Sequence, residues 1–295
     1  MKPRIAIVGP GRVGQSIGRL LCRAGYPVSA VVGRDMDATR AGAGFIGAEL
    51  MATSHLERCG SAEVIFLTVP DDALGAVAEQ LAGIALPAGT LVVHCSGLHT
   101  TGILSSVCAS RHDIQTLALH PLQTFASPAA GCEALPGSYC SLQGDADALE
   151  HGHRIAADLG CHPFVIDAGH KIRYHAAACM VSNYITALID AATELCADIP
   201  DADNIFPAAF KPLLEAAVRN SVSAGPTRAL TGPVARGDSG TLKAHILALE
   251  KDNPDLLPLY RILGQHTLGL AEKGHRLDSE HIEELRTILS QGGNL

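Results

Sequence analysis

The stretch that most constrains the fold of this chain is Ile5 to Leu21, which reads IAIVGPGRVGQSIGRLL. Its glycines Gly9, Gly11 and Gly14 form the pattern G-x-G-x-x-G directly after a short apolar run and directly before a segment with helical apolar spacing. In this arrangement the first glycine makes a tight turn, the second lets a pyrophosphate approach the backbone, and the third lets the helix pack against the strand. The stretch therefore predicts the first βαβ unit of a dinucleotide-binding domain, with the helix N-terminus facing the phosphates.

The chain changes character near residue 167. Before that point short β-branched runs alternate with helical segments, which is typical of a mostly parallel, doubly wound sheet with helices on both faces. After it, one long helical segment runs from Lys171 to Cys196 with no strand-like run behind it. Further helical stretches follow near residues 207–223, 239–251, 254–272 and 278–290. We expect an α/β fold, with a Rossmann domain over residues 1–167 and an all-α domain over residues 168–295.

The choice between the two nicotinamide dinucleotides depends on the end of the second predicted strand. An acidic residue there would bind the ribose 2′-hydroxyl of NAD, but the residue twenty positions after Gly14 is Arg34. A guanidinium pairs with a 2′-phosphate, so the sequence favours NADP, with Arg40 and Arg12 as possible helpers. The alternative is that Asp35 binds the ribose and Arg34 is a solvated neighbour.

Two later strand ends should also reach the cofactor, because ligands of open α/β sheets lie at the carboxyl ends of the strands. They read TVPD, from Thr68 to Asp71, and HCSG, from His94 to Gly97, although each also suits an ordinary turn. The predicted cofactor-binding residues are Gly9, Pro10, Gly11, Arg12, Val13, Gly14, Arg34, Thr68, Val69, Pro70, Ser96 and Gly97.

Composition excludes several classes of partner. The net charge is −8 and no long Lys or Arg run occurs, so neither nucleic acid nor an anionic membrane surface is expected. The N-terminal apolar run is too short for a signal peptide or a spanning helix, which predicts a cytoplasmic protein. The nine cysteines include no C-x-x-C pair, and the His151 and His153 pair lacks further ligands at metal spacing. We therefore expect no metal.

Candidate catalytic residues lie on the long helix and at the end of an earlier predicted strand, which ends in His120 and Pro121. Lys171, His175 and Asn183 recur at multiples of four residues, so we expect them along one side of a helix. Reduction of a ketone or imine needs a proton donor, and an imidazole can donate near neutral pH. His175 is thus the predicted donor and Asn183 a substrate ligand. Lys171 is the competing donor, although a solvated first-turn lysine is the favoured interpretation of it.

A third polar cluster lies in RALTGPVARGDSGTLKAH, between Arg228 and His245. Arg236 could pair with a substrate carboxylate, and Thr231 could hydrogen-bond the substrate, whereas Asp238 is better explained as a helix cap. Gln123, close after His120, completes the predicted substrate-binding residues with Thr231 and Arg236.

Along nearly its whole length the sequence resembles Rossmann-like proteins whose C-terminal domain is the domain of unknown function DUF2520, a group associated with NADP oxidoreductases. The motifs that carry the resemblance are GPGRVG, TVPD, LHPLQTF, YHAAACMVSNY and LTGPVARGDSGTL. The resemblance implies kinship with 6-phosphogluconate and 3-hydroxyisobutyrate dehydrogenases, pyrroline-5-carboxylate reductase and ketopantoate reductase. It also implies a homodimer formed through the helical domain.

The resemblance comes with a departure at the catalytic helix. Hydroxyacid dehydrogenases of the group carry a catalytic Lys and, four residues later, an Asn, and the matching positions here are His175 and Cys179. The pair His120 and Pro121 is similar to an active-site pair of prephenate dehydrogenases, which supports a substrate-side role for His120.

These observations lead to one main hypothesis and one alternative. The main hypothesis is an NADP(H)-dependent oxidoreductase that acts on a small carboxylate-bearing ketone or imine, with a ketopantoate-type compound as the leading single substrate. The alternative is a non-catalytic NADP-binding sensor whose second domain binds a protein partner.

Overall fold

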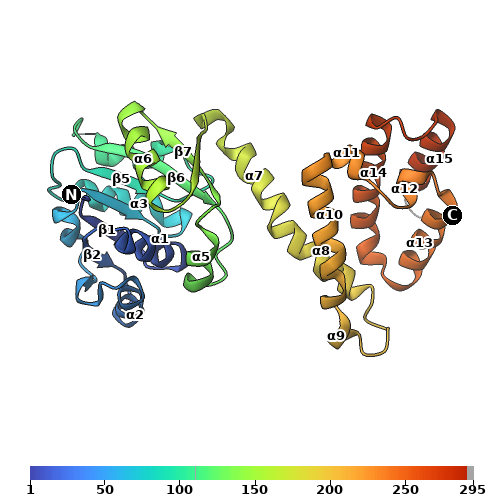
Figure 1. The fold of residues 1–295 in the computed structure, drawn as a ribbon, viewed down its shortest axis with the longest axis horizontal. Helices are drawn as coiled ribbons and strands as arrows, with labels where there is room; N and C mark the ends of the chain where they lie inside the picture. Colours follow the sequence, from blue (N-terminus) through green and yellow to red (C-terminus); the bar gives the residue numbers. More distant parts are fainter. Residues whose placement is uncertain (110, 291–295) are drawn as a thin grey trace. The chain divides into compact units, whose positions relative to one another are not determined.

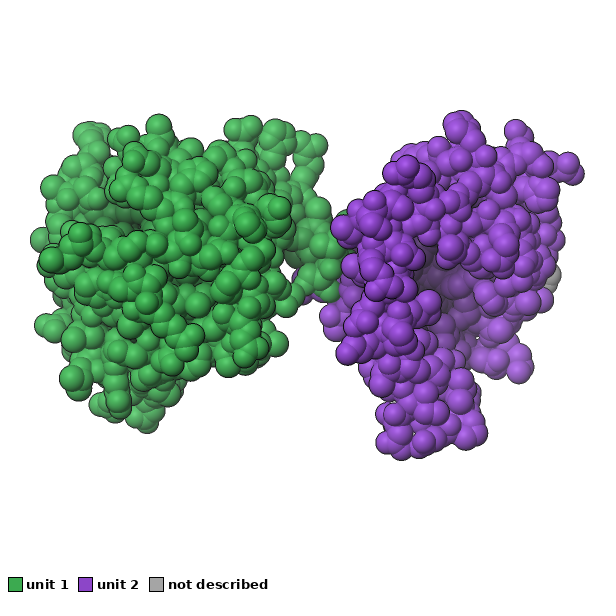
Figure 2. Space-filling model, in the orientation of Figure 1, with its two compact units in different colours: residues 1–182 green, residues 183–295 purple. Residues whose placement is uncertain are grey.

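The computed structural model describes residues 1–109 and 111–290, and it divides into two compact units, residues 1–182 and 183–295 (Figure 2). The predicted domain boundary at residue 167 lies one helix before this division. The first unit keeps that helix because Lys171, Tyr174 and His175 contact the ends of its strands.

The first unit is built on a mixed, mostly parallel sheet of eight strands in the order β3-β2-β1-β4-β5-β6-β7-β8 (Figure 1). Only the pairing of β6 with β7 is antiparallel among the described strands. This confirms the predicted α/β class. The strands are β1 (Ile5–Val8), β2 (Val28–Val32), β3 (Ala52–Thr53), β4 (Val64–Leu67), β5 (Leu91–His94), β6 (Gln115–Leu122), β7 (Tyr139–Gly144) and β8 (His162–Val165).

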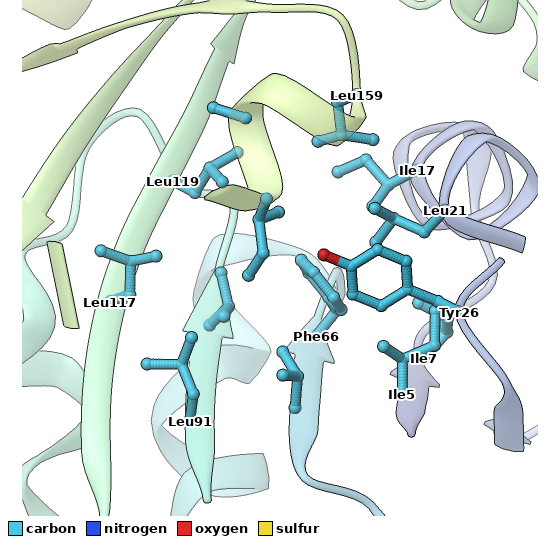
Figure 3. Packing of buried hydrophobic residues seen from close by; sticks show 14 of the residues in the cluster. Ile5, Ile7, Ile17, Leu21, Tyr26, Phe66, Leu91, Leu117, Leu119 and Leu159 are labelled. Carbon is cyan, nitrogen blue, oxygen red and sulfur yellow. The ribbon is translucent and has the colours of Figure 1, made fainter. Parts of the chain in front are cut away.

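Alternating residues of the central strands bury themselves in two separate cores. In β1, Ile5 and Ile7 belong to one hydrophobic cluster, shown in Figure 3, while Ala6 and Val8 belong to another. Because successive side chains of a strand point to opposite faces, the sheet has a core on each side, as a doubly wound fold requires. The helices of this unit are α1 (Arg12–Arg23), α2 (Met36–Ile46), α3 (Asp71–Ala82), α4 (Ser105–Cys108), α5 (Pro128–Ala134), α6 (Ala146–Asp158) and α7 (Lys171–Val181).

The regular elements of the second unit are all helices over its described residues, as predicted. Its helices are α8 (Asn183–Glu194), α9 (Ala202–Ile205), α10 (Lys211–Ala224), α11 (Pro226–Ala229), α12 (Pro233–Arg236), α13 (Ser239–Asp252), α14 (Leu257–Lys273) and α15 (Ser279–Ser290). Its core cluster draws its buried side chains from α12 to α15, whereas α8 and α10 bury none of their residues.

The long helix expected between Lys171 and Cys196 is interrupted. Ser182, with φ −122° and ψ −77°, separates α7 from α8. The combined stretch from Ala168 to Glu194 is the one helical segment among the described residues with the length and apolar composition of a membrane span, and its most apolar window is not buried. Length and composition alone are weak evidence for a span, because helices of soluble proteins pass the same test.

Candidate functional site

The glycine loop after β1 has the three features predicted from its sequence. Gly9 adopts φ +86°, where side chains are strained, and its N–H donates to the Val32 carbonyl at 2.8 Å. A Cβ at Gly14 would lie 2.4 Å from the Thr68 hydroxyl and 2.6 Å from the Gly9 carbonyl oxygen, so helix and strand pack at backbone distance. A Cβ at Gly11 would meet no atom within 4 Å. The loop is therefore tight at its two ends and open at its centre.

The open centre of the loop belongs to a cavity of about 540 Å³ at the carboxyl ends of β1, β2 and β4. A volume of this size suits a drug-sized or cofactor-sized ligand. The lining residues are Val8, Gly9, Pro10, Gly11, Val32, Gly33, Arg34, Asp35, Ala38, Thr39, Ser54, Leu56, Thr68, Val69, Pro70, Ala73, Ala76, Val77 and Gln80.

The wall of this cavity is held by short polar contacts that leave its interior free. The Thr68 hydroxyl lies 2.7 Å from the Gly9 carbonyl oxygen and 3.1 Å from that of Val8, to which it can donate, so it ties β4 to the glycine loop. The side-chain amide of Gln15 donates to the Pro10 carbonyl at 2.7 Å. No side chain caps α1 at Gly11, which leaves the first N–H groups of that helix available to an anion.

The two residues after β2 that compete for the ribose differ in what they already bind. Asp35 caps α2, because its Oδ1 accepts from the backbone N–H groups of Asp37 and Ala38 at 2.9 and 3.0 Å. Arg34 is exposed at the cavity wall. Arg40 pairs with Asp37 at 3.3 Å and does not line the cavity. Arg34 and Asp35 both line the cavity, but Oδ1 of Asp35 is already bound to the start of the helix, which leaves Arg34 as the cavity's cationic residue.

The turn after β5 is organised by His94 and Ser96. The Ser96 hydroxyl accepts from the N–H groups of Leu98 and His99, while the Ser96 N–H donates to His94 Nδ1 at 3.2 Å. His94 Nε2 lies 3.2 Å from the Thr100 carbonyl oxygen. Burial, followed by the charge of Lys171, lowers the pKa of His94 to about 3. The neutral ring therefore accepts at Nδ1 and donates at Nε2, and it fixes the turn that presents Gly97.

Two histidines converge on Gly97. A side chain there would begin 2.2 Å from Cδ2 of His175 and 2.9 Å from the Nε2 atoms of both His120 and His175. The rings of the two histidines meet edge to face, with centroids 5.8 Å apart. His120 Nδ1 also lies 3.0 Å from the Tyr174 hydroxyl. Burial, followed by the charges of Lys171 and His175, lowers the pKa of His120 to about 4. We call His120, Tyr174, His175 and Lys171 the histidine cluster.

Lys171 is fully buried, which contradicts the favoured interpretation of it as a solvated lysine. Its exposed fraction is zero, and its Nζ has no hydrogen-bond partner among the described residues. Burial lowers the pKa of Lys171 to about 8, against smaller opposing effects of Cys95 and Asp71. This burial could not be predicted from the sequence, because a lysine in the first turn of a helix is usually solvated.

The remaining predicted residues lie outside the cavity and the cluster. Ser96 and Gly97, with Arg12, Val13 and Gly14, do not line the cavity. Gln123 is exposed and donates to the Ala134 carbonyl at 3.2 Å.

In the second unit, Asn183 begins α8 and is exposed, as is Thr231. Asp238 caps α13 through the Thr241 N–H at 3.0 Å, as expected, and its side chain lies 4.0 Å from Arg236, whose side chain is 66% exposed. Among residues 1–109 and 111–290, no group of three or more His, Cys, Asp and Glu side chains is placed to hold a metal ion.

Tyr174 and His94 are the residues that sequence reasoning missed. His94 stands in the HCSG motif, of which only Ser96 and Gly97 are predicted to bind the cofactor. Tyr174 directly precedes His175, and helical spacing gave it no special role. Its role depends on the packing of α7 against β6, which brings Tyr174 to His120, and the sequence alone does not predict that packing.

Two family models match the chain. Residues 1–121 match the Rossmann-like domain, and residues 138–267 match a domain of unknown function, DUF2520. These matches confirm the resemblance drawn from the sequence motifs. A search among curated proteins found no match.

Solved structures share the fold over nearly the whole chain. BF3122 from Bacteroides fragilis, described provisionally as an NADP oxidoreductase, is 21% identical, with a TM-score of 0.74 over 92% of this chain and 98% of that one. Protein TM1727 from Thermotoga maritima is 24% identical, with a TM-score of 0.68 over 92% of this chain and 99% of that one. A pyrroline-5-carboxylate reductase from Coxiella burnetii is 17% identical, with a TM-score of 0.58 over 98% and 99% of the two chains. At these identities the likeness establishes the fold.

Proposed function

We propose that this chain, which carries a Rossmann-like domain followed by a DUF2520 domain, is an NADP(H)-dependent oxidoreductase acting on a small ketone or imine that bears a carboxylate. The observation that carries the proposal is the open centre of the glycine loop. Gly11 faces free space inside a cavity whose wall includes an exposed arginine and whose one nearby carboxylate already caps a helix. Structural relatives described as reductases support the same reaction class.

The residues of the cavity fit a dinucleotide phosphate. The backbone at Gly9 to Gly11 and the uncapped start of α1 would hold the pyrophosphate, and Arg34 would pair with the 2′-phosphate. Thr68, Val69 and Pro70 would contact the ribose side. When bound, the nicotinamide supplies or accepts a hydride.

The histidine cluster would provide the acid–base groups. β5 and β6 lie two and three places from β1 in the sheet, so about 10–14 Å separates the glycine loop from Gly97. His175, whose Nε2 reaches the point above Gly97, would deliver the proton to the substrate oxygen or nitrogen. Lys171, buried nearby, would disfavour protonation of His120 through its charge. Asn183, Gln123, Thr231 and Arg236 stay predictions as substrate ligands.

The first experiment is a titration of the purified protein with NADPH and, separately, NADH. The chain has no Trp, so the emission of the nucleotide itself reports binding. Arg34→Gln should weaken NADPH by about 10- to 100-fold, the value of one charge-assisted hydrogen bond, and leave NADH within twofold. Arg23→Gln is the matched control, because Arg23 is exposed at the far end of α1 and does not line the cavity.

Two outcomes would contradict the proposal. Failure of the wild-type protein to bind either nucleotide would remove the cofactor, and an equal loss of NADPH and NADH in Arg34→Gln would remove the 2′-phosphate contact. If NADPH binds, 2-oxo acids of the ketopantoate type and cyclic imines should be screened for its oxidation. Binding without turnover of any of them would favour the NADP sensor.

We also propose that a second copy of this chain covers α8 and α10. Neither helix buries a residue, and α10 presents Leu213, Val218 and Val222 at 68%, 55% and 81% exposure. An isolated helix of this length is marginal in water, so these helices need a partner surface. A bilayer is disfavoured as that surface by the net charge of −8.

Analytical ultracentrifugation at micromolar concentration should therefore show a dimer. The double change Val218→Glu with Val222→Glu should dissociate it, whereas Lys211→Glu, at an exposed position on the same helix, should not. A monomeric wild-type protein, or one that floats with lipid vesicles, would overturn this assignment.

A further inference from the structure

Tyr174 connects the histidine cluster to the interior of the first unit. It lies on α7 one position before His175, and its ring packs edge to face on His120, with centroids 5.6 Å apart, and on Phe164 of β8, with centroids 5.8 Å apart. Its hydroxyl lies 3.0 Å from His120 Nδ1. Packing on two sides therefore fixes the position from which this hydroxyl meets the imidazole.

The direction of this hydrogen bond follows from the chemistry of the two groups. Burial raises the pKa of Tyr174 above its usual value, so the phenol keeps its proton at neutral pH. A phenol O–H is a better donor than a neutral imidazole N–H, and an unprotonated imidazole nitrogen is a better acceptor than a phenol oxygen. Tyr174 therefore donates, and His120 Nδ1 accepts.

The other side of the Tyr174 hydroxyl agrees with this direction. The buried Ser141 hydroxyl, on the residue paired with His120 across β6 and β7, lies beside it and partly offsets the rise in the pKa of Tyr174. Ser141 Oγ makes no hydrogen bond of normal geometry, so the contact is loose. It places a donor, and no carboxylate, beside the phenol oxygen.

An imidazole that accepts at Nδ1 and is neutral carries its proton on Nε2. That atom lies 2.9 Å from the point above Gly97 where a Cβ would stand, and Nε2 of His175 lies at the same distance from that point. The charged and titratable groups around His120 include Lys171, His175, Tyr174 and His94, and none of them is a carboxylate that would stabilise an imidazolium.

We propose that Tyr174 is a positioning residue that holds His120 in the neutral tautomer protonated on Nε2, so that His120 donates a hydrogen bond to the reacting oxygen or nitrogen of the substrate. The second half of this statement rests on the proposed function, and the first half does not. In this division of work His175 transfers the proton, while His120 polarises the bond that is reduced without changing its own charge.

The tautomer can be measured without substrate or cofactor. Two-bond ¹H–¹⁵N correlation spectra of the labelled protein distinguish the two neutral tautomers, and the signals of His120 are those lost in His120→Gln. We expect the Nε2-protonated form of His120 throughout pH 5.5–8. A wild-type spectrum with the proton on Nδ1, or with a charged ring, would overturn the proposal even if no variant could be purified.

Tyr174→Phe removes the hydroxyl and keeps the ring packing. We expect His120 to become a mixture of tautomers, and kcat of the reductase reaction to fall about tenfold with little change in KM. Unchanged His120 signals in this variant would also overturn the proposal.

A matched control exists in the second unit, where the Tyr260 hydroxyl lies 2.8 Å from His245 Nδ1 and the two rings are also edge to face. Tyr260→Phe should alter the His245 signals and leave both His120 and kcat unchanged. Because the tautomer is read in the free protein, absence of reductase turnover would count against the proposed function alone.

Discussion

The cavity beside the glycine loop and the histidine cluster lie at the same edge of the sheet but are built from different kinds of residue. The cavity is lined mostly by backbone, small residues and aliphatic side chains, with Arg34 and Asp35 as its charged residues, and it includes the free space at Gly11. The cluster is filled by long polar side chains, one of them a buried lysine whose Nζ has no hydrogen-bond partner in the described part of the chain. A surface made by backbone at the end of a strand is set by local sequence, whereas the cluster is assembled by contacts between α7 and strands about fifty residues earlier in the chain.

Within the glycine loop, the effect on folding and the effect on binding are separated by adding one methyl group at each of two glycines, Gly14 and Gly11. Gly14→Ala places a Cβ 2.4 Å from the Thr68 hydroxyl and 2.6 Å from a backbone carbonyl, so we expect a loss of about 3–4 kcal/mol in the free energy of unfolding. Gly11→Ala meets nothing within 4 Å and has φ −77°, so its stability should change by only a few tenths of a kcal/mol.

The two variants should also differ in NADPH binding. Any loss of binding in Gly14→Ala should follow from its loss of stability, whereas the loss in Gly11→Ala should occur in a stable protein. Gly11→Ala should fold normally and bind NADPH at least tenfold more weakly, because the methyl group occupies the space left for the pyrophosphate. Urea unfolding and nucleotide titration measure the two effects separately. Normal NADPH affinity in Gly11→Ala would show that the open centre of the loop is not where the phosphates bind.

In the cluster, the corresponding change removes the buried charge. The pKa of Lys171 lies near 8 in the folded protein and at its ordinary value of 10.5 in the unfolded chain. Between these values the unfolded chain holds more protons, so stability rises with pH across this window, and the full penalty is present below pH 8. The difference between these two pKa values corresponds to about 3 kcal/mol in the free energy of unfolding. Lys171→Met should therefore stabilise the protein by up to about 3 kcal/mol at pH 7.

Urea unfolding at pH 7 and pH 9.5 checks this sign. At pH 7 Lys171→Met should have the larger free energy of unfolding. At pH 9.5 its advantage over the wild-type protein should be smaller, because the wild-type protein gains stability as the pH rises. Lys211→Met, which removes an exposed lysine, should change stability by less than about 0.5 kcal/mol at both values. If Lys171→Met is destabilised at pH 7, the ammonium has a stabilising partner and is not held at a cost for function.

The contrast between cavity and cluster also explains how far the sequence predicts this molecule. The doubly wound sheet, the helical second half and the Asp238 cap depend on spacing over a few residues, and each is confirmed. The close contacts at Gly9 and Gly14 and the open space at Gly11 also agree with the glycine spacing, while the approach of a pyrophosphate at Gly11 stays a prediction. Burial of Lys171 and the contact of Tyr174 with His120 depend on where α7 lies against β6, β7 and β8. No periodicity of α7 encodes that placement, because its polar residues lie within its first five positions and an apolar run from Ala176 to Val181 follows, so apolar spacing selects no face.

Gly97 is the position where the two regions can be told apart by one substitution. It was predicted to contact the cofactor, yet its free side is occupied by His120 and His175, and it does not line the cavity. Gly97→Ala would place a Cβ 2.2 Å from the His175 ring, so one or both imidazoles must move. Displacement of catalytic groups by about 1 Å costs roughly a hundredfold in rate, which is about 2.7 kcal/mol of activation free energy. We therefore expect kcat to fall by about that factor, with the dissociation constant of NADPH unchanged within twofold.

Gly75→Ala, whose new Cβ would make only an ordinary contact at 3.6 Å, serves as the control. If Gly97→Ala instead weakens NADPH and leaves kcat intact, Gly97 contacts the nicotinamide as the sequence first indicated, and the histidines above it are packing residues rather than the source of the proton.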